Sequence, residues 1–280
     1  MKNRHKPIRI AILDLYEGVV NQGIDALYRI IDTIKHLKGI EIEVKRFEVR
    51  KNNEIPGLDF DIYLSSGGPG SPIDTNQIWE KDYFEWVDDI CRYNESVENE
   101  SKKFVFFICH SFQLACRHFN LAHVSKRSKN AFGIYPISLT MEGKKDLIFS
   151  GMSDEIWAVD SRDYQATLPD MAQLQKFGAT ILATETVGIQ ENAIMAIRFN
   201  RYMAGTQFHP EANDEGLMRY MNHPESKLKI LSEHGEQVWA ETMEKLRNPE
   251  GIKKTYATVL PLFIMDSIDQ SCQIKVDHDL

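Results

Sequence analysis

Short apolar segments and longer amphipathic segments alternate through the first half of the chain. Runs rich in Ile, Val and Phe predict strands, and apolar residues three or four positions apart predict helices. The predicted strands are residues 8–15, 41–49, 61–64 and 104–108. The predicted helices are residues 22–37, about 76–93 and 111–119. This alternation predicts an α/β fold built on a parallel, doubly wound sheet with flanking helices.

The pattern changes in the second half of the chain. From about residue 124 to 206 it is rich in strands, and the clearest are residues 133–140, 179–183, 193–199 and 202–206. Asn200-Arg201 is interpreted as a hairpin turn. After Pro210 the chain is predicted to be helical to about residue 270, with breaks at Pro224 and Pro249. We therefore expect an α/β domain over residues 1–220 and a helical C-terminal extension over 221–280, packed on that domain.

Composition and charge exclude several classes of protein. The 280 residues are 42% hydrophobic and 26% charged, as expected for a globular chain that buries a core. The net charge of −8 argues against a nucleic-acid partner, because phosphate binding needs clustered Lys and Arg. No apolar run reaches the roughly 18–20 residues of a bilayer-spanning helix, so no membrane partner is expected. The basic residues 2–6 precede a short apolar run, which indicates a first strand rather than a signal peptide.

The cysteines suggest a cytoplasmic chain without a metal. Cys91, Cys109, Cys116 and Cys272 form no CxxC pair and have no metal-ligand spacing with histidine. We therefore expect no metal and no cofactor. Free thiols are typical of the reducing cytoplasm, so any special cysteine is expected to be catalytic.

One cysteine stands where a buried strand turns sharply into a helix. Cys109 directly follows the apolar run 104–108 and precedes the predicted helix 111–119. Such an elbow lifts a nucleophilic side chain above the carboxyl edge of the sheet, and the helix N-terminus favours the thiolate. Cys109 is therefore a candidate nucleophile, with an inert buried thiol as the alternative. Cys116, inside the helix, is interpreted as a core residue.

Two further segments supply what a cysteine nucleophile needs. His209 and Glu211 follow another predicted strand and offer a base together with a carboxylate to orient it. The loop Ser66-Gly67-Gly68-Pro69 also follows a strand, and its glycines let the backbone come close to a ligand. Ligands of open α/β sheets bind at the carboxyl ends of the strands, so the three segments are expected to converge there.

These motifs resemble those of the class I (triad-type) glutamine amidotransferases, in particular the glutaminase domain of GMP synthases. The loop 66–69 matches the family's S-G-G-P sequence. Ile108, Cys109 and Gln113 match its G-I-C-x-G-x-Q elbow. Residues 205–211 match its final G-x-Q-F-H-P-E motif completely. The resemblance covers about residues 8–213, so the C-terminal extension lies outside it.

The resemblance implies a flavodoxin-like sheet and a catalytic triad of Cys109, His209 and Glu211. Cys109 would attack the side-chain amide of glutamine, giving a γ-glutamyl thioester and ammonia. His209 would take the thiol proton and pass it to the leaving amine, and Glu211 would orient the imidazole. The backbone N–H groups of Gly68 and His110 would form the oxyanion hole.

The resemblance also implies a set of substrate-binding residues. Gly67 and Gln113 match family positions in the loop and the elbow. The family's S-H-G-D motif aligns with residues 160–163, so Ser161, Arg162 and Asp163 are candidates, although only the aspartate matches. Arg162 replaces a glycine and is expected either to crowd the pocket or to grip a different carboxylate.

Residues beside the nucleophile also depart from the family pattern. Phe107 and Ser111 replace two glycines, and Phe107 is expected to strain or shift the elbow. His110 resembles the histidine that directly follows the nucleophile in the related intracellular protease-like superfamily. It is therefore an alternative to His209 as the partner of Cys109.

Three functions stay open on these residues. The first is hydrolysis of glutamine, with ammonia passed to a separate synthase subunit in trans, since the chain has no synthase signature such as a P-loop. The second is hydrolysis of another γ-glutamyl amide or peptide, which Arg162 favours. The third is a binding or regulatory module with impaired turnover, which Phe107 favours. The apolar segment 259–265 is interpreted as covering the core or a homo-oligomer interface.

Overall fold

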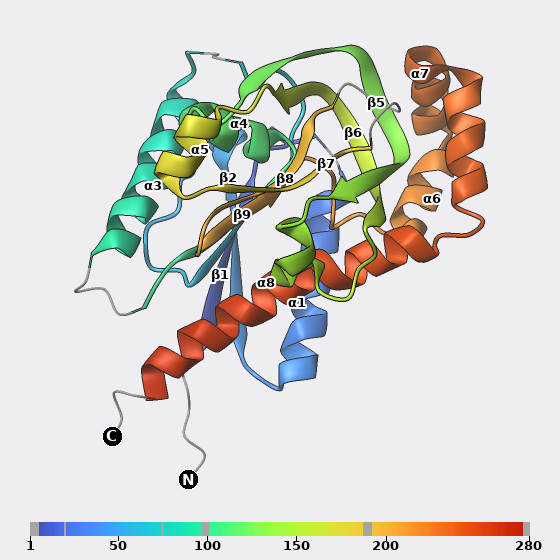
Figure 1. Ribbon diagram of the computed structural model, residues 1–280. Coiled ribbons are helices and arrows are strands. Elements are labelled where there is room, and N and C mark those ends of the chain that lie inside the picture. Colours follow the sequence, from blue (N-terminus) through green and yellow to red (C-terminus); the bar gives the residue numbers. More distant parts are fainter. Residues whose placement is uncertain (1–5, 20, 74–75, 97–100, 187–191, 277–280) are drawn as a thin grey trace.

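One mixed sheet with helices on both faces forms the centre of the protein (Figure 1). The computed structural model describes residues 6–19, 21–73, 76–96, 101–186 and 192–276. Within these residues nine strands pair in the order β2-β1-β3-β4-β9-β8-β7-β5-β6. Residues 2–5 of the basic N-terminal segment lie outside the described residues.

Five strands of this sheet run parallel. They are β1 (Ile8–Asp14), β2 (Ile42–Glu48), β3 (Ile62–Ser65), β4 (Phe104–Ile108) and β9 (Met203–Thr206). The order of the parallel strands, β2-β1-β3-β4-β9, is that of flavodoxin-like sheets. The fold class predicted from the alternation of strands and helices is therefore confirmed.

The remaining strands are antiparallel and continue the sheet beyond β9. They are β5 (His123–Leu139), β6 (Glu155–Thr167), β7 (Thr180–Glu185) and β8 (Ile194–Asn200). β8 and β9 form the hairpin that was predicted at Asn200-Arg201. This half of the sheet places β6 beside the segment that follows β9, where Val159 bridges to His209.

Helices cover both faces because successive residues of β1 point in opposite directions. One face packs on α1 (Gly23–Lys38) and α8 (Glu250–Val276), with Ile10 and Ile12 of β1 in that core. The other packs on α3 (Ile78–Glu95), α4 (His110–His118) and α5 (Met171–Phe177), with Ala11 and Leu13 in that core. Figure 1 shows α8 crossing the sheet beside α1. The shorter helices are α2 (Val49–Asn52), η1 (Gly143–Lys145) and η2 (Leu147–Phe149).

The C-terminal segment is helical as far as the structure describes it. It contains α6 (Asp214–Asn222), α7 (Pro224–Lys245) and α8. Pro224 begins α7 and Pro249 precedes α8, so both prolines interrupt the helical segment where predicted. Helices α6 and α7 pack on β5 and β6 through a third apolar cluster, and α8 contributes Val259 and Phe263 to the main core.

Strand β6 was absent from the sequence prediction. Its side chains alternate as in any strand, but the buried positions include Asp160, Arg162 and Gln165. Polar residues at buried positions hide the apolar alternation by which a strand is recognised. The same pairing extends β5 back to His123, ten residues before the start predicted from its apolar part.

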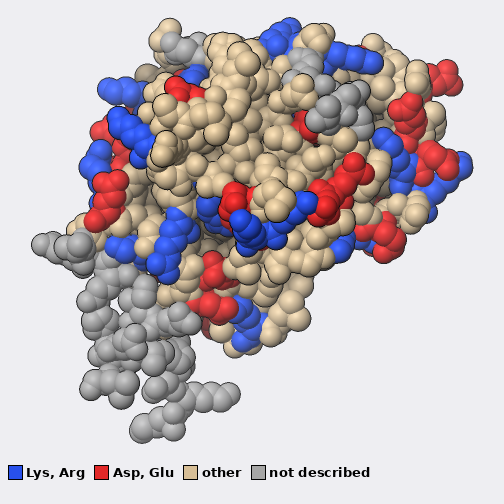
Figure 2. Space-filling view, in the orientation of Figure 1, with Lys and Arg blue, Asp and Glu red and all other residues tan. Residues whose placement is uncertain are grey.

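Charged side chains of both signs are interspersed on the face shown in Figure 2, around a broad uncharged area. The excess of acidic residues is therefore not gathered into one patch on that face. Among the residues that the structure describes, no helix combines the length and the apolar character needed to cross a membrane.

Candidate active site

Cys109 occupies the sharp turn between β4 and α4. Its backbone has φ 49° and ψ −99°, a conformation that costs energy for a residue with a side chain. Hydrogen bonds on both sides hold the turn: the Cys109 amide donates to the Thr206 carbonyl at 2.8 Å. The Ser111 hydroxyl accepts from the Ile108 amide and donates to the Ser65 carbonyl, each at 2.8 Å. Ser111 therefore ties the elbow to β3.

The structure accommodates Phe107 without placing it in the turn. Its ring is fully buried on the α3–α4 face and meets Phe199 edge-on, with centroids 5.5 Å apart. Phe107 pairs with Gly205 on β9, where an added Cβ would lie 2.7 Å from the Phe107 carbonyl oxygen. The strained backbone is that of Cys109 itself, and a glycine on the neighbouring strand leaves room for the phenylalanine.

His209 lies between Cys109 and a carboxylate. Its Nδ1 is 2.7 Å from Glu211 Oε1. The point where a Cβ on Gly67 would sit lies 2.9 Å from His209 Cε1 and 3.5 Å from Cys109 Cβ, so the imidazole and the cysteine side chain lie close together at this glycine. The His209 amide donates to the Val159 carbonyl at 2.9 Å, which fixes the residue against β6. Burial opposes the charged imidazole, but Glu211 and the Cys109 thiolate outweigh it and raise the pKa of His209 well above its ordinary value. The arrangement favours the charged imidazolium form of His209.

The glycine loop after β3 closes over this pair. A Cβ on Gly67 would lie 2.9 Å from His209 Cε1, and one on Gly68 would lie 2.4 Å from the Leu15 carbonyl oxygen. Neither position has room for a side chain, so the backbone of the loop can approach the nucleophile closely.

Tyr16 is a member of the site that the sequence patterns did not indicate. Its hydroxyl oxygen lies 3.3 Å from the point where a Cβ on Gly67 would sit, and 2.8 Å from the corresponding point on Gly23. Burial raises the pKa of Tyr16 well above its ordinary value, and the charges of Glu211 and Cys109 raise it further. The phenol is therefore a neutral hydrogen-bond donor beside the nucleophile. A lone tyrosine after the first strand carries no sequence signal of such a role.

Two glutamines support the nucleophile from below. Gln207 is fully buried and its Nε2 lies 3.8 Å from Cys109 Sγ. Gln113 Nε2 donates to Gln207 Oε1 at 3.1 Å and to the Tyr164 carbonyl at 2.9 Å. Both hydrogen bonds of the Gln113 amide nitrogen are thus made within the protein. Gln207 holds the Gln113 side chain in place beneath Cys109. The sequence prediction included Gln207 only as part of a motif.

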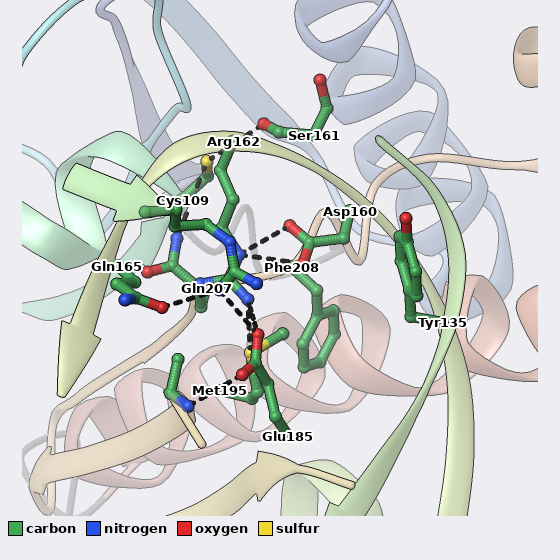
Figure 3. A network of polar contacts seen from close by, with 12 residues as sticks. Cys109, Tyr135, Asp160, Ser161, Arg162, Gln165, Glu185, Met195, Gln207 and Phe208 are labelled. Carbon is green, nitrogen blue, oxygen red and sulfur yellow. Dashed lines mark hydrogen bonds and ion pairs between the residues drawn. The ribbon is translucent and has the colours of Figure 1, made fainter. Parts of the chain in front are cut away.

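Arg162 differs from its predicted role because β6 alternates. Ser161 and Asp163 are exposed and border the cleft, whereas the Arg162 side chain is 1% exposed and points to the other side (Figure 3). Its Nε lies 2.8 Å from Asp160 Oδ2, and its NH2 contacts Glu185 Oε1. We therefore correct the sequence interpretation: this guanidinium neither crowds the pocket nor grips a substrate carboxylate, because carboxylates of the protein occupy it.

His110 is buried next to the nucleophile but is not charged. Burial lowers its pKa to about 3, and the nearby Arg50 and Arg117 contribute to the shift. Among the described residues its Nε2 has no hydrogen-bond partner. An imidazole that resists protonation is a poor base, so the geometry favours His209 over His110 as the partner of Cys109.

The low pKa of His110 is expected to weaken the fold in acid. The unfolded histidine takes up a proton near pH 6.5, whereas the folded one does so only near pH 3, so the unfolding free energy falls as the pH drops between these values. Between pH 7 and pH 5 this residue should remove about 2 kcal/mol of stability. Urea unfolding at both pH values should show a correspondingly smaller drop for His110→Gln. The exposed His36→Gln serves as the control, and an unchanged drop in His110→Gln would contradict the assignment.

A cleft of about 690 Å³ opens at this edge of the sheet. The predicted site residues that border it are Gly68, Cys109, His110, Gln113, Ser161, Asp163, His209 and Glu211. Arg162 also touches the cleft, although its guanidinium is bound to Asp160 and Glu185. Gly67 lies directly behind the pair of Cys109 and His209. Within the described residues no group of three His, Cys, Asp or Glu side chains is placed to hold a metal ion. The cleft thus brings together the thiol of Cys109, the imidazole of His209, the Glu211 carboxylate bound to it and a loop of closely packed glycines.

Comparison with known proteins agrees with this geometry. Residues 19–219 match the model of the family Glutamine amidotransferase class-I. A glutamine amidotransferase from Thermotoga maritima shares 15% identity and has a TM-score of 0.63, covering 94% of this chain and 99% of its own. A GMP synthase subunit-like protein from Thermoplasma acidophilum shares 18% (TM-score 0.50, covering 89% and 99%). The glutaminase domain of Trypanosoma brucei CTPS, with bound acivicin, shares 15% (TM-score 0.52, covering 73% and 86%).

At these identities the solved structures establish the fold alone, and no curated protein sequence matches the chain. The family match spans most of the chain and includes the elbow, the glycine loop and the segment with His209. The chain therefore belongs to the class-I glutamine amidotransferase family.

Proposed function

We propose that the chain hydrolyses the side-chain amide of glutamine through a γ-glutamyl thioester on Cys109. The observation that carries this proposal is the position of His209, which is hydrogen-bonded to Glu211 and lies beside Cys109 in the cleft. A thiolate with a histidine partner and an orienting carboxylate is the arrangement that acyl transfer from an amide requires.

In the first half of the reaction the Cys109 thiolate attacks the amide carbon. The oxygen of the tetrahedral intermediate is held by the backbone N–H groups of Gly68 and His110. The imidazolium of His209 then gives its proton to the leaving nitrogen, the C–N bond breaks and ammonia departs.

In the second half water replaces ammonia. His209 accepts a proton from the water as it attacks the thioester carbon, and the C–S bond breaks to release glutamate and the Cys109 thiolate. Glu211 holds the imidazole in one orientation throughout, since its carboxylate is 3% exposed and bound to Nδ1. Gly67, Gln113, Ser161 and Asp163 are the proposed substrate-binding residues. The proposed location is the cytoplasm, where the free thiols stay reduced.

The identity of the partner protein depends on where the released ammonia goes. We propose transfer to a synthase subunit in trans, because the chain belongs to the class-I glutamine amidotransferases and one similar structure is a GMP synthase subunit-like protein. The alternative is that hydrolysis alone is the function, without transfer of ammonia. The extent of the cleft beyond Cys109 favours this alternative.

The experiment is intact-mass analysis after treatment with 6-diazo-5-oxo-norleucine, a glutamine-like alkylating agent. We expect one adduct on the unmodified protein, protection by excess glutamine, and no adduct on Cys109→Ala. The matched control is Cys91→Ala, because Cys91 is a half-buried thiol of α3 outside the cleft. Steady ammonia release from glutamine should accompany the labelling and disappear with Cys109.

The opposite results separate the alternatives. Labelling of Cys109 by a general thiol reagent but not by the glutamine analogue would contradict glutamine as the ligand. Failure of both reagents on folded protein would contradict catalysis altogether and favour a binding module.

A further inference from the structure

The cleft continues well beyond the nucleophile. A volume of about 690 Å³ is in the range of pockets for drug-sized ligands, whereas glutamine has only about ten non-hydrogen atoms. The additional part of the cleft is bounded by α1 on one side and by α6 and α7 on the other. Figure 1 shows α6 and α7 beside β5 and β6. The family match ends at residue 219, so the wall formed by α7 belongs to this chain rather than to the family's common domain.

The outer wall, by which we mean the cleft-lining residues of α6 and α7, contacts its neighbours on both sides of a kink in α7 at Gly235 (φ 86°, ψ 165°). The His234 ring stacks on Phe132 of β5, with centroids 5.0 Å apart and planes 26° apart. Trp239 donates from its indole to the Met221 carbonyl at 3.3 Å, which joins α7 to α6. Lys245 donates to the Ile134 carbonyl at 2.7 Å, which joins α7 to β5. These contacts fix the outer wall relative to Cys109.

Cations and carboxylates both line this part of the cleft. Arg29 of α1, Arg219 of α6 and Lys229 of α7 are exposed and form no ion pair with any residue that the structure describes. The acidic groups are Asp163 of β6, with Glu225 and Glu233 of α7. A lining of both signs suits a ligand that carries ammonium and carboxylate groups together.

We propose that the preferred substrate is a γ-glutamyl amide whose leaving amine is an amino acid or short peptide with a free carboxylate. The γ-glutamyl part lies at Cys109, and the carboxylate of the leaving amine lies against Arg219 and Lys229. This inference rests on the proposed function, since it uses the same thioester chemistry. It changes only the group on the scissile nitrogen.

The reaction balances in the same way as for glutamine. The Cys109 sulfur bonds to the γ-carbon, the C–N bond breaks, and the amino group of the departing amino acid takes its proton from His209. Water then cleaves the thioester, so the products are glutamate and a free amino acid. No oxidant, reductant or further reactant is needed.

The test compares three amides that differ only on the nitrogen: L-glutamine, γ-glutamylethylamide and γ-glutamylglycine. We expect kcat/KM for γ-glutamylglycine to exceed the values for both other amides by at least about tenfold, because only it carries the second carboxylate. In the variant Arg219→Ala/Lys229→Ala this preference should fall about tenfold, mainly through a higher KM for γ-glutamylglycine. Lys254→Ala, which removes an exposed lysine of α8 outside the cleft, should retain the preference.

The outcomes distinguish this inference from the proposed function. Efficient turnover of glutamine together with poor turnover of γ-glutamylglycine would overturn the inference and leave the proposed function intact. Equal turnover of γ-glutamylethylamide and γ-glutamylglycine would overturn recognition of the carboxylate. An equal loss on all three amides in the double variant would assign these cations a structural role. If no amide is hydrolysed and the glutamine analogue does not label Cys109, the proposed function fails and the inference fails with it.

Discussion

Replacement of His209 by alanine is expected to lower kcat/KM for amide hydrolysis by about 10⁴-fold or more. The loss is large because one imidazole serves both half-reactions, first as the donor to the leaving nitrogen and then as the base for water. The raised pKa of His209 indicates that the neighbouring negative groups stabilise the imidazolium. The alanine variant has no group that can carry this proton. The measurement is steady-state release of glutamate and, for glutamine, of ammonia.

Three variants place this loss in context. Glu211→Gln keeps the shape of the side chain but removes its charge, and should lower kcat by about 10³- to 10⁴-fold. His110→Gln should lose at least about 100-fold less than His209→Ala, because His110 stays neutral. His118→Gln, at a histidine that pairs with Asp88 away from the cleft, is the control for histidine replacement in general. An equal loss in His110→Gln and His209→Ala would contradict the choice between the two histidines.

The parallel half of the sheet was predictable because local signals agree with the fold there. Its strands are continuous apolar runs, and the loops after β3, β4 and β9 are short segments that carry polar or glycine residues. The carboxyl ends of parallel strands share one edge, so the meeting of Gly67, Cys109 and His209 follows from the order of the elements. The meeting of these three segments could therefore be predicted before any distance was known.

The remainder of the site depends on contacts between segments that carry no such signal. Tyr16 reaches the nucleophile only because α1 begins with a glycine that leaves space for its hydroxyl. The outer wall comes from α6 and α7, whose apolar patterns predict helices but not the strands on which they pack. The role of Arg162 was misjudged because a strand with buried charges does not have the alternation of an amphipathic strand.

That strand contains part of a buried network of charges. Arg162 binds Asp160 and Glu185 (Figure 3). The Arg127 NH1 donates to Glu185 Oε1 at 2.9 Å. The two cations and two carboxylates balance one another in an interior where an unpaired charge is costly. Although burial opposes its charge, Asp160 and Glu185 hold the pKa of Arg162 above its ordinary value. The network joins β5, β6 and β7 directly behind Ser161, whose carbonyl lies 3.9 Å from Cys109 Sγ.

Arg162→Met is therefore expected to cost about 3–5 kcal/mol of unfolding free energy at pH 7. The methionine fills a similar volume but leaves Asp160, which is fully buried, and Glu185, which is 2% exposed, with one cation fewer. Urea unfolding at pH 7 measures this deficit relative to the unchanged protein.

The control for this variant is Arg247→Met, which removes a cation from an exposed pair with Glu244 and should change stability by less than about 0.5 kcal/mol. A comparison of the two separates the removal of an arginine from the removal of a buried charge. If Arg162→Met cost less than about 1 kcal/mol, the carboxylates would not depend on this guanidinium. Because the network lies behind the Ser161 carbonyl, a destabilised Arg162→Met protein should also react more slowly with the glutamine analogue at Cys109, even at temperatures where it stays folded.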